Sequence, residues 1–446
     1  MKIPFSDKLT RLCENFPVPL YIVGGYVRNY LIDGYISQDV DLAAPLKSDD
    51  AESYISRAGF KIIAEYKRTG TIVFTDGESK YEYTSFRKDE YVGGGHSPEK
   101  TTFTTDILSD AIRRDFKCNA VYYDLKSGEL VDPLGGVADV KNKILDTTVS
   151  PEVVFSHDGL RLMRLARFSG ELNFKPTESV IAGARRFAAN INDVAKERVF
   201  DELKKILVSD AKYPFSDTIG HYTALKILEK TRVLDEILPE LTAGRGMPQR
   251  SDFHDYDVLE HSLRSVLYAD KSVRLAALLH DVGKPAAFFE TGKFLGHDKR
   301  GATIVDGIAK RLKFDNKTKE TAVFLTRYHM ADLDLKTKEN KVRLFIAENV
   351  KRFHDLMLIK QADFSACKDD ISPAPTVVKW QKIYDDMKKR GLPFSVKELN
   401  ITADDLIAAG VRRERLGDTM KTLLKKVITG KIKNEKQAIL SAMAKL

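Results

Sequence analysis

The sequence contains little cysteine and no long apolar segment. Its 446 residues include three cysteines, Cys13, Cys118 and Cys367, which lie far apart and form no Cys-x-x-Cys pair. This argues against a disulfide framework and a cysteine-rich metal site, and it favours a reducing compartment. No apolar segment is as long as the core of a signal peptide or a membrane-spanning helix. We therefore expect a cytoplasmic protein with no membrane partner.

Two hydrophobic patterns divide the chain. Up to about residue 125, short apolar runs predict strands, and from Pro151 onward apolar residues recur at helical spacing. Together they predict an α+β fold with its sheet at the N-terminal end. The polar, glycine-rich stretch 87–105 is predicted to be a functional loop. The expected strands are Leu20–Val23, Asp39–Leu42, Gly70–Phe74, Tyr81–Phe86 and Asn119–Tyr123.

The most informative stretch is a Gly-Gly turn followed by two aspartates. Gly24-Gly25 precedes a helix that carries Arg28, and Asp39 and Asp41 follow on an expected strand. Strand side chains alternate, so both carboxylates point to one face, where they suit Mg²⁺. Backbone N–H groups at a glycine turn and helix start attract phosphate. This combination predicts metal-dependent chemistry on a nucleoside triphosphate.

A second motif lies in the helix that begins near Asp158. Arg161 lies three residues after it, one turn along the same helix, and Arg164 and Arg167 follow at the same interval. Asp158 offers acceptors and Arg161 donors for the edge of a base, while the other arginines can reach phosphates. A solvated helix with salt bridges would show the same spacing. The preceding Gly-Gly and Asp-x-Asp motif favours nucleotide binding.

The third motif is a set of histidines and aspartates in the helical region. His261, the adjacent His280 and Asp281, and Asp363 offer imidazole and carboxylate ligands for a divalent metal. Isolated histidines on helices are more often buried structural groups than ligands. Because most of the nine histidines fall in this region, a metal site is the stronger interpretation.

Taken in order, these stretches resemble the class II nucleotidyltransferase family of bacterial CCA-adding enzymes and their poly(A) polymerase relatives. The resemblance rests on residues 24–28, 39–41, 113–116 and 158–168. The His261, His280-Asp281 and Asp363 region is similar to the HD domain that some bacterial members carry. The resemblance implies a DNA polymerase beta-like head over residues 1–146 and an all-α neck with a nucleotide-selecting helix over 147–245. It also implies an HD domain over 246–370 and a basic, tRNA-contacting tail over 371–446.

In this family the chain would add C, C and A to the tRNA 3′ end from CTP and ATP, without a nucleic-acid template. Asp39 and Asp41 would hold Mg²⁺ as catalytic residues, and Glu82 is a candidate third carboxylate. His261, His280, Asp281 and Asp363 would hold a second divalent metal, which implies a possible phosphohydrolase activity. The implied nucleotide-binding residues are Gly25, Arg28, Arg114, Asp158, Arg161, Arg164 and Arg167.

Two positions depart from the family pattern. Asn29 follows Arg28 where the family usually has aspartate, and His157 precedes Asp158 where it usually has glutamate. Because Asp158 and Arg161 are both present, we expect nucleotide choice to be retained.

Several alternatives stay open. The enzyme could add only CC or only A, with the 87–105 stretch governing the switch, or it could be a poly(A) polymerase. From other classes, it could be an HD phosphohydrolase with a nucleotide-sensing head, or an RNA-binding protein.

The net charge of +8 is concentrated in residues 412–446, which hold ten lysines and arginines and three acidic residues. This run favours a nucleic-acid contact.

Overall fold

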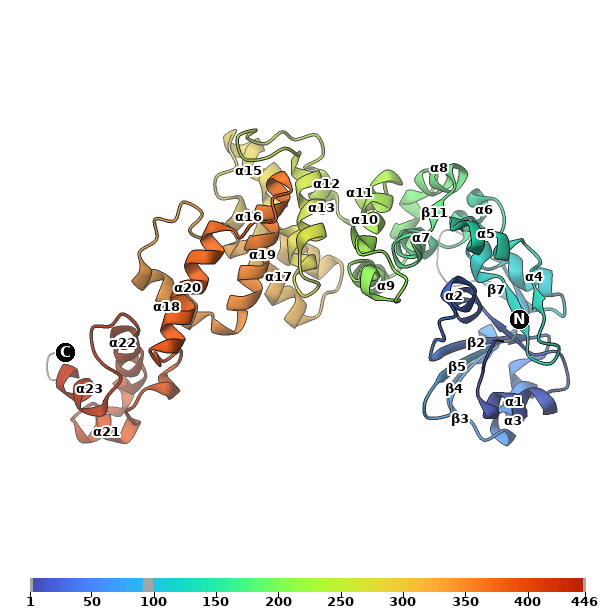
Figure 1. Ribbon diagram of the computed structural model, residues 1–446, viewed down its shortest axis with the longest axis horizontal. Coiled ribbons are helices and arrows are strands. Elements are labelled where there is room, and N and C mark those ends of the chain that lie inside the picture. The colour runs from blue at the N-terminus through green and yellow to red at the C-terminus, as the bar shows by residue number, and fades with distance from the viewer. Residues whose placement is uncertain (1–2, 91–98, 444–446) are drawn as a thin grey trace. The chain divides into compact units, whose positions relative to one another are not determined.

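The computed structural model describes residues 3–90 and 99–443. They form two compact units (Figure 1). The first comprises Met1–Pro239 with Arg311–Lys313, and the second comprises Glu240–Lys310 with Phe314–Leu446. The division into head, neck, HD domain and tail at residues 146, 245 and 370 stays a prediction.

A seven-stranded sheet dominates the start of the first unit, in the order β3-β4-β5-β2-β1-β8-β9. Within it β2 and β5 pair in parallel, and the other neighbouring strands pair antiparallel. The strands are β1 (Tyr21–Val23), β2 (Asp39–Ala44), β3 (Lys61–Tyr66), β4 (Thr71–Thr75), β5 (Lys80–Ser85), β8 (Tyr122–Asp124) and β9 (Leu130–Val131).

The alternation of side chains along β2 separates the core from the site. Val40 and Leu42 join the larger core, to which helices α1 (Asp7–Asn15) and α3 (Ser48–Arg57) contribute. Figure 1 shows these two helices side by side. The residues of the other parity, Asp39 and Asp41, therefore lie on the opposite face.

Helix α2 (Gly25–Asp33) is bounded by glycines with positive φ, Gly24 at 78° and Gly34 at 68°. A Cβ atom on Gly24 would lie 3.1 Å from Oδ2 of Asp41. Glycine therefore serves both the left-handed backbone and the close approach of β2.

Two sequence expectations were wrong in detail. The 87–105 stretch contains a hairpin of β6 (Arg87–Glu90) and β7 (Lys100–Phe103), while residues 91–98, with the triple glycine, lie outside the described residues. Its strands were missed because their mostly polar side chains give no hydrophobic signal. The expected strand at 119–123 starts only at Tyr122, because Lys117–Asn119 forms a 3-10 turn.

The rest of the first unit is mainly helical, as expected. Helix α7 (Leu160–Leu172) packs closely on α10 (Gly220–Lys230), where a Cβ on Gly170 would lie 2.4 Å from the carbonyl oxygen of Gly220. The elements are α4 (Ile107–Ile112), α5 (Gly136–Asn142), β10 (Ile144–Leu145), α6 (Pro151–His157), α7 (Leu160–Leu172), β11 (Lys175–Pro176), α8 (Glu178–Arg186), α9 (Lys196–Ile206), α10 (Gly220–Lys230) and α11 (Val233–Ile237). The short helix α12 (Pro239–Thr242) begins at the last residue of this unit's main segment and otherwise belongs to the second unit.

The described part of the second unit is helical, and its last helices share a small core of their own that includes Leu406, Leu423 and Ile439. Among the described residues, no helix combines the length and apolar character needed to cross a membrane. The helices are α13 (Val258–Tyr268), α14 (Arg274–Leu279), α15 (Gly283–Thr291), α16 (His297–Arg311), α17 (Asn316–Tyr328), α18 (Glu339–Glu348), α19 (Val350–Lys368), α20 (Pro375–Lys389), α21 (Ala403–Ala408), α22 (Leu416–Ile428) and α23 (Lys436–Met443).

Candidate functional site

Three carboxylates lie on one face of the sheet. Asp39 and Asp41 belong to β2, and Glu82 of the parallel strand β5 is the register partner of Asp41. Residues in register on neighbouring strands project to the same side, so Glu82 joins the aspartates. All three residues retain solvent-exposed surface, although protein atoms surround Asp41 closely enough to desolvate its carboxylate. The sequence suggested Glu82 by its position, and the pairing of the two strands supplies its orientation.

These carboxylates fit a divalent cation. In the described part of the chain, no side chain donates a hydrogen bond or forms an ion pair with any of the three. Burial against surrounding protein, together with the neighbouring charge of Glu82, raises the pKa of Asp41 to about 6. Carboxylates that repel one another in this way are stabilised by a bound metal ion, and their hard oxygens suit Mg²⁺.

Arg28 is buried near the first turn of α2. Its Nη1 donates to the side-chain oxygen of Asn119, and its Nε and Nη2 donate to that of Asn29, at 3.1 and 2.8 Å. Asn29, one of the departures from the family pattern, therefore holds the guanidinium of Arg28 with a neutral acceptor.

Arg114 is held by a buried carboxylate that the sequence analysis did not single out. Its Nη2 lies 3.0 Å from Oδ2 of Asp110, and its Nε lies 3.1 Å from the hydroxyl of Tyr122. Asp110 also binds Arg113 at 2.7 Å. Although burial opposes ionisation, the two guanidinium groups lower the pKa of Asp110 to about 2. This network orients Arg114.

Asp158 and Arg161 are both buried, but they do not share a helix as the sequence suggested: Asp158 lies in an extended conformation between α6 and α7, and Arg161 lies in the first turn of α7. The Asp158 carboxylate accepts a hydrogen bond from the backbone N–H of Leu160 at 2.9 Å and lies 3.9 Å from Nε of Arg161. Arg161 also donates to the carbonyl oxygen of Arg113. Burial raises the pKa of Asp158 to about 6. The two side chains predicted to read the base are therefore neighbours, and Arg161 links α7 to the segment that carries Arg114.

The other two arginines of α7 form ion pairs within the first unit. Arg164 binds the buried Asp115 at 2.6 Å, and Arg167 lies 2.8 Å from Glu202 of α9. Asp115 was part of the recognised motif without an assigned role. Glu202 was missed, because no local spacing connects it with Arg167. These acids hold the two guanidinium groups in place.

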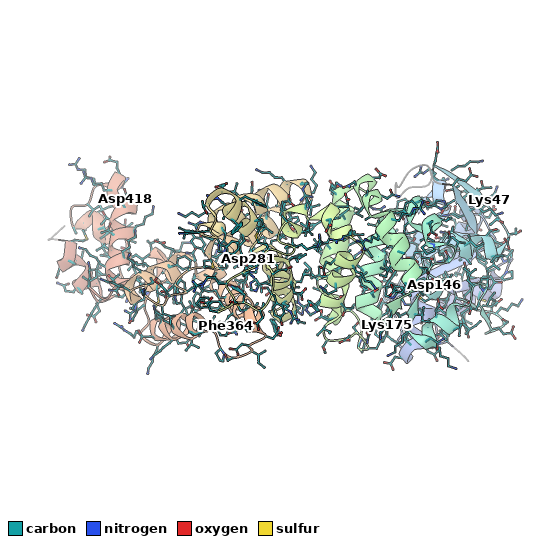
Figure 2. All side chains as sticks on the ribbon, turned by 90° about the horizontal axis from the view of Figure 1, so that it is seen from above. Lys47, Asp146, Lys175, Asp281, Phe364 and Asp418 are labelled. Carbon is teal, nitrogen blue, oxygen red and sulfur yellow. The ribbon has the colours of Figure 1, made fainter. Side chains whose placement is uncertain are left out.

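A separate cluster lies inside the second unit, where Figure 2 labels Asp281. Nε2 of His261 is 3.0 Å from Oδ1 of Asp363 and 3.4 Å from Oδ2 of Asp281. His280 Nε2 is 3.2 Å from the same Asp281 oxygen and 3.4 Å from Asp363. The four HD residues predicted from sequence are thus brought together.

Two further histidines complete this HD cluster, which we define as His261, His280, Asp281, His297, His329 and Asp363. His297 and His329 approach the second oxygen of Asp281, at 3.2 and 3.6 Å. Nδ1 of His280, His297 and His329 each lies 2.7 Å from the carbonyl oxygen three residues earlier. Such hydrogen bonds orient metal-binding imidazoles.

The electrostatics of the HD cluster also suit a cation. Although burial opposes it, Asp281 raises the pKa of His280 to about 10. The buried carboxylates therefore attract positive charge, which Lys284 supplies in part from 2.6 Å. A divalent ion could satisfy the same carboxylates.

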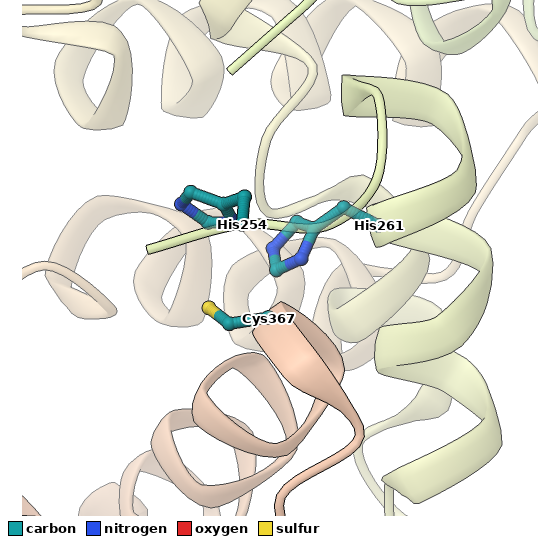
Figure 3. A group of neighbouring side chains, drawn as sticks. All are labelled: His254, His261 and Cys367. Atoms are coloured by element: carbon teal, nitrogen blue, oxygen red, sulfur yellow. The ribbon is translucent and has the colours of Figure 1, made fainter. Parts of the chain in front are cut away.

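His254 and Cys367 lie beside His261, as Figure 3 shows. One ligand atom of each of the three residues lies within 4.8 Å of the others. This group shares His261 with the HD cluster and extends its edge with a softer sulfur donor.

Comparisons with known proteins agree with this arrangement. Residues 20–146 match the poly A polymerase head domain, 173–244 a region described as the probable RNA and SrmB-binding site of polymerase A, and 258–363 the HD domain. An A-adding tRNA nucleotidyltransferase from Deinococcus radiodurans is 32% identical over 372 residues, which cover 79% of this chain and 78% of that protein. The chain belongs to the class II tRNA nucleotidyltransferase family. It carries an HD domain, and enzymes of this family use divalent metal ions.

Other relatives extend this result. A multifunctional CCA protein from Tolumonas auensis is 29% identical over 369 residues, covering 77% of this chain and 84% of that protein. The structure of the Bacillus stearothermophilus CCA-adding enzyme in complex with CTP aligns with a TM-score of 0.66 and 20% identity, covering 99% of this chain and 98% of that one. The predicted fold class, an α+β protein with a nucleotidyltransferase head and helical remainder, is confirmed.

Proposed function

We propose that this enzyme completes the 3′ end of tRNA by adding C, C and A from CTP and ATP. The observation that carries the proposal is the set of Asp39, Asp41 and Glu82 on one sheet face, in the same unit as the α7 arginines. Relatives named as CCA-adding and A-adding enzymes support it. We place the reaction in the cytoplasm, because the proposed substrate is tRNA and the three cysteines are unpaired.

Asp39 and Asp41 would hold Mg²⁺, with Glu82 beside them. The bound ions would activate the attacking 3′-hydroxyl and stabilise the departing pyrophosphate. Arg28, Arg114 and the α7 arginines would bind the triphosphate and orient it for attack.

Asp158 and Arg161 would select the base. A carboxylate accepts and a guanidinium donates, so together they can match the hydrogen-bonding edge of a nucleobase. The basic run in residues 412–446 would bind the tRNA backbone, and this contact should weaken steeply with salt.

The experiment is extension of a tRNA transcript that lacks its CCA end, with CTP alone, ATP alone or both. Growth by two residues with CTP, and by a third when ATP joins, supports the proposal. Growth that stops at CC, or that requires a CC-ended tRNA and ATP, means a partial enzyme, and long adenylate tails mean a poly(A) polymerase. Asp39→Ala should abolish extension, while the matched variant Asp33→Ala, at the exposed end of α2, should not. Wild-type protein that extends none of these RNAs refutes the proposal.

A second function is favoured by the HD cluster. We propose that its four imidazoles and two carboxylates bind divalent metal and remove terminal or cyclic phosphates from RNA 3′ ends. Asp281→Ala should abolish hydrolysis of a 2′,3′-cyclic phosphate and leave tRNA extension intact, and Asp39→Ala should do the reverse. Loss of hydrolysis in Asp39→Ala, or its survival in Asp281→Ala, contradicts this assignment.

A further inference from the structure

One aromatic ring lies at the centre of three arginines in the first unit. Phe168 of α7 is 5% exposed. The guanidinium carbons of Arg28, Arg164 and Arg167 lie 5.0, 5.0 and 4.5 Å from its ring centroid. These arginines come from two elements, α2 and α7, and all three belong to the proposed triphosphate site.

There is a physical reason for an aromatic side chain at position 168. Three guanidinium groups gathered in one place repel one another before any phosphate binds, whereas the face of a phenyl ring carries partial negative charge and attracts cations. Phe116 meets Phe168 nearly at right angles, at 88° and 5.9 Å, which helps to hold the ring in its orientation. An aliphatic side chain could fill the space but would not attract the arginines.

Arg28 depends on this ring more than the other two do. Arg164 and Arg167 have carboxylate partners in Asp115 and Glu202, at 2.6 and 2.8 Å. Arg28 is 2% exposed, and its acceptors among the described residues are the neutral side-chain oxygens of Asn29 and Asn119. With asparagine at position 29, no carboxylate among the described residues forms an ion pair with Arg28 within 4 Å, and the ring face adds to the longer-range attraction of the buried Glu171.

We propose that Phe168 is a positioning residue, which uses cation–π contacts to hold Arg28, Arg164 and Arg167 in the geometry that binds the nucleoside triphosphate. This proposal rests on the proposed nucleotidyl transfer. It adds a residue that does not touch substrate but sets the positions of residues from two motifs.

The first test compares Phe168→Leu with Phe168→Tyr. Leucine keeps an apolar side chain without a π face, while tyrosine keeps the face. We expect Phe168→Leu to weaken CTP binding about tenfold, or about 1.4 kcal/mol, with a matching rise in KM and a small change in kcat, and Phe168→Tyr to restore binding. Equilibrium dialysis with labelled CTP and no tRNA measures binding without turnover. The matched control is Phe187→Leu. Phe187 caps the C-terminal end of α8, and its ring centroid lies 5.7 Å from the guanidinium carbon of Arg186, so this variant also removes one cation–π contact, away from the proposed triphosphate site.

A second test separates electrostatics from packing. Phenylalanines with one, two and three ring fluorines at position 168 keep nearly the same shape while progressively weakening the negative ring face. The logarithm of the CTP dissociation constant should rise steadily with fluorine number. A flat series, or Phe168→Leu binding CTP like wild type, overturns the inference. Wild-type protein that binds CTP but extends no tRNA instead counts against the proposed function, so the two failures are distinguishable.

Discussion

The pairing of Asp41 with Glu82 should couple metal binding in the first unit to pH. Burial and the charge of Glu82 raise the pKa of Asp41 to about 6. The carboxylate is therefore charged above about pH 6 and becomes protonated below it, and only the charged form can bind a metal ion. From this pKa, the apparent dissociation constant for Mg²⁺ should rise about tenfold at pH 5 but change by only a few per cent at pH 7.5.

The assay is isothermal titration of Mg²⁺ in the Asp281→Ala background, which removes the contribution of the HD cluster. Near pH 6, two buffers of different ionisation enthalpy should report release of about half a proton per ion bound. Glu82→Gln removes one cause of the raised pKa, so the midpoint of the pH dependence should move to lower pH. The matched control Glu78→Gln changes an exposed glutamate in the turn before β5 and should leave the midpoint in place.

The midpoint of the pH dependence is informative even if Glu82 also binds the ion. Losing a ligand lowers the affinity for Mg²⁺ at every pH, whereas a change in the pKa of Asp41 moves the midpoint. An affinity for Mg²⁺ that is constant between pH 5 and 7.5 would refute the reasoning. Equal midpoints in wild type and Glu82→Gln would show that Glu82 does not contribute to the raised pKa of Asp41.

Three further predictions concern polar side chains at the two sites and in the network around Arg114. Asp110→Asn should cost roughly 3 kcal/mol in urea unfolding, because it leaves two partly buried arginines without their nearest carboxylate. Since the pKa of Asp110 is lowered to about 2, its stabilisation is present above the usual pKa near 3.8 and is lost as the pH falls through about 2. Unchanged unfolding would show that the arginines find other partners. Asp281→Ala should lose the divalent metal of the second unit, measured by elemental analysis of purified protein, whereas His354→Ala, an exposed histidine on α19, should keep it; equal metal content would contradict the site. His157→Glu should change nucleotide addition little, because Asp158 and Arg161, which would read the base, stay in place; a change in the number of bases added, measured on gels, would count against our reading of the pocket.

The candidate site residues of the first unit could be predicted from sequence where the chemistry depends on local spacing. Asp39 and Asp41 share a face because a strand alternates its side chains. Glycine at position 24 predicts the turn because few other residues accept a φ of 78°. The helical remainder could likewise be predicted from the repeat of its apolar residues. The 87–105 hairpin could not, because its strands are mostly polar.

The sequence by itself determined the fold class, the family and the paired aspartates, since each depends on residues a few positions apart. Only the tertiary structure decided that Glu82 faces Asp41, that His297 and His329 approach Asp281, and that Phe168 lies among three arginines. The physical reason is that strand register and helix packing bring together side chains separated by tens of residues, and no local periodicity records which of them will meet.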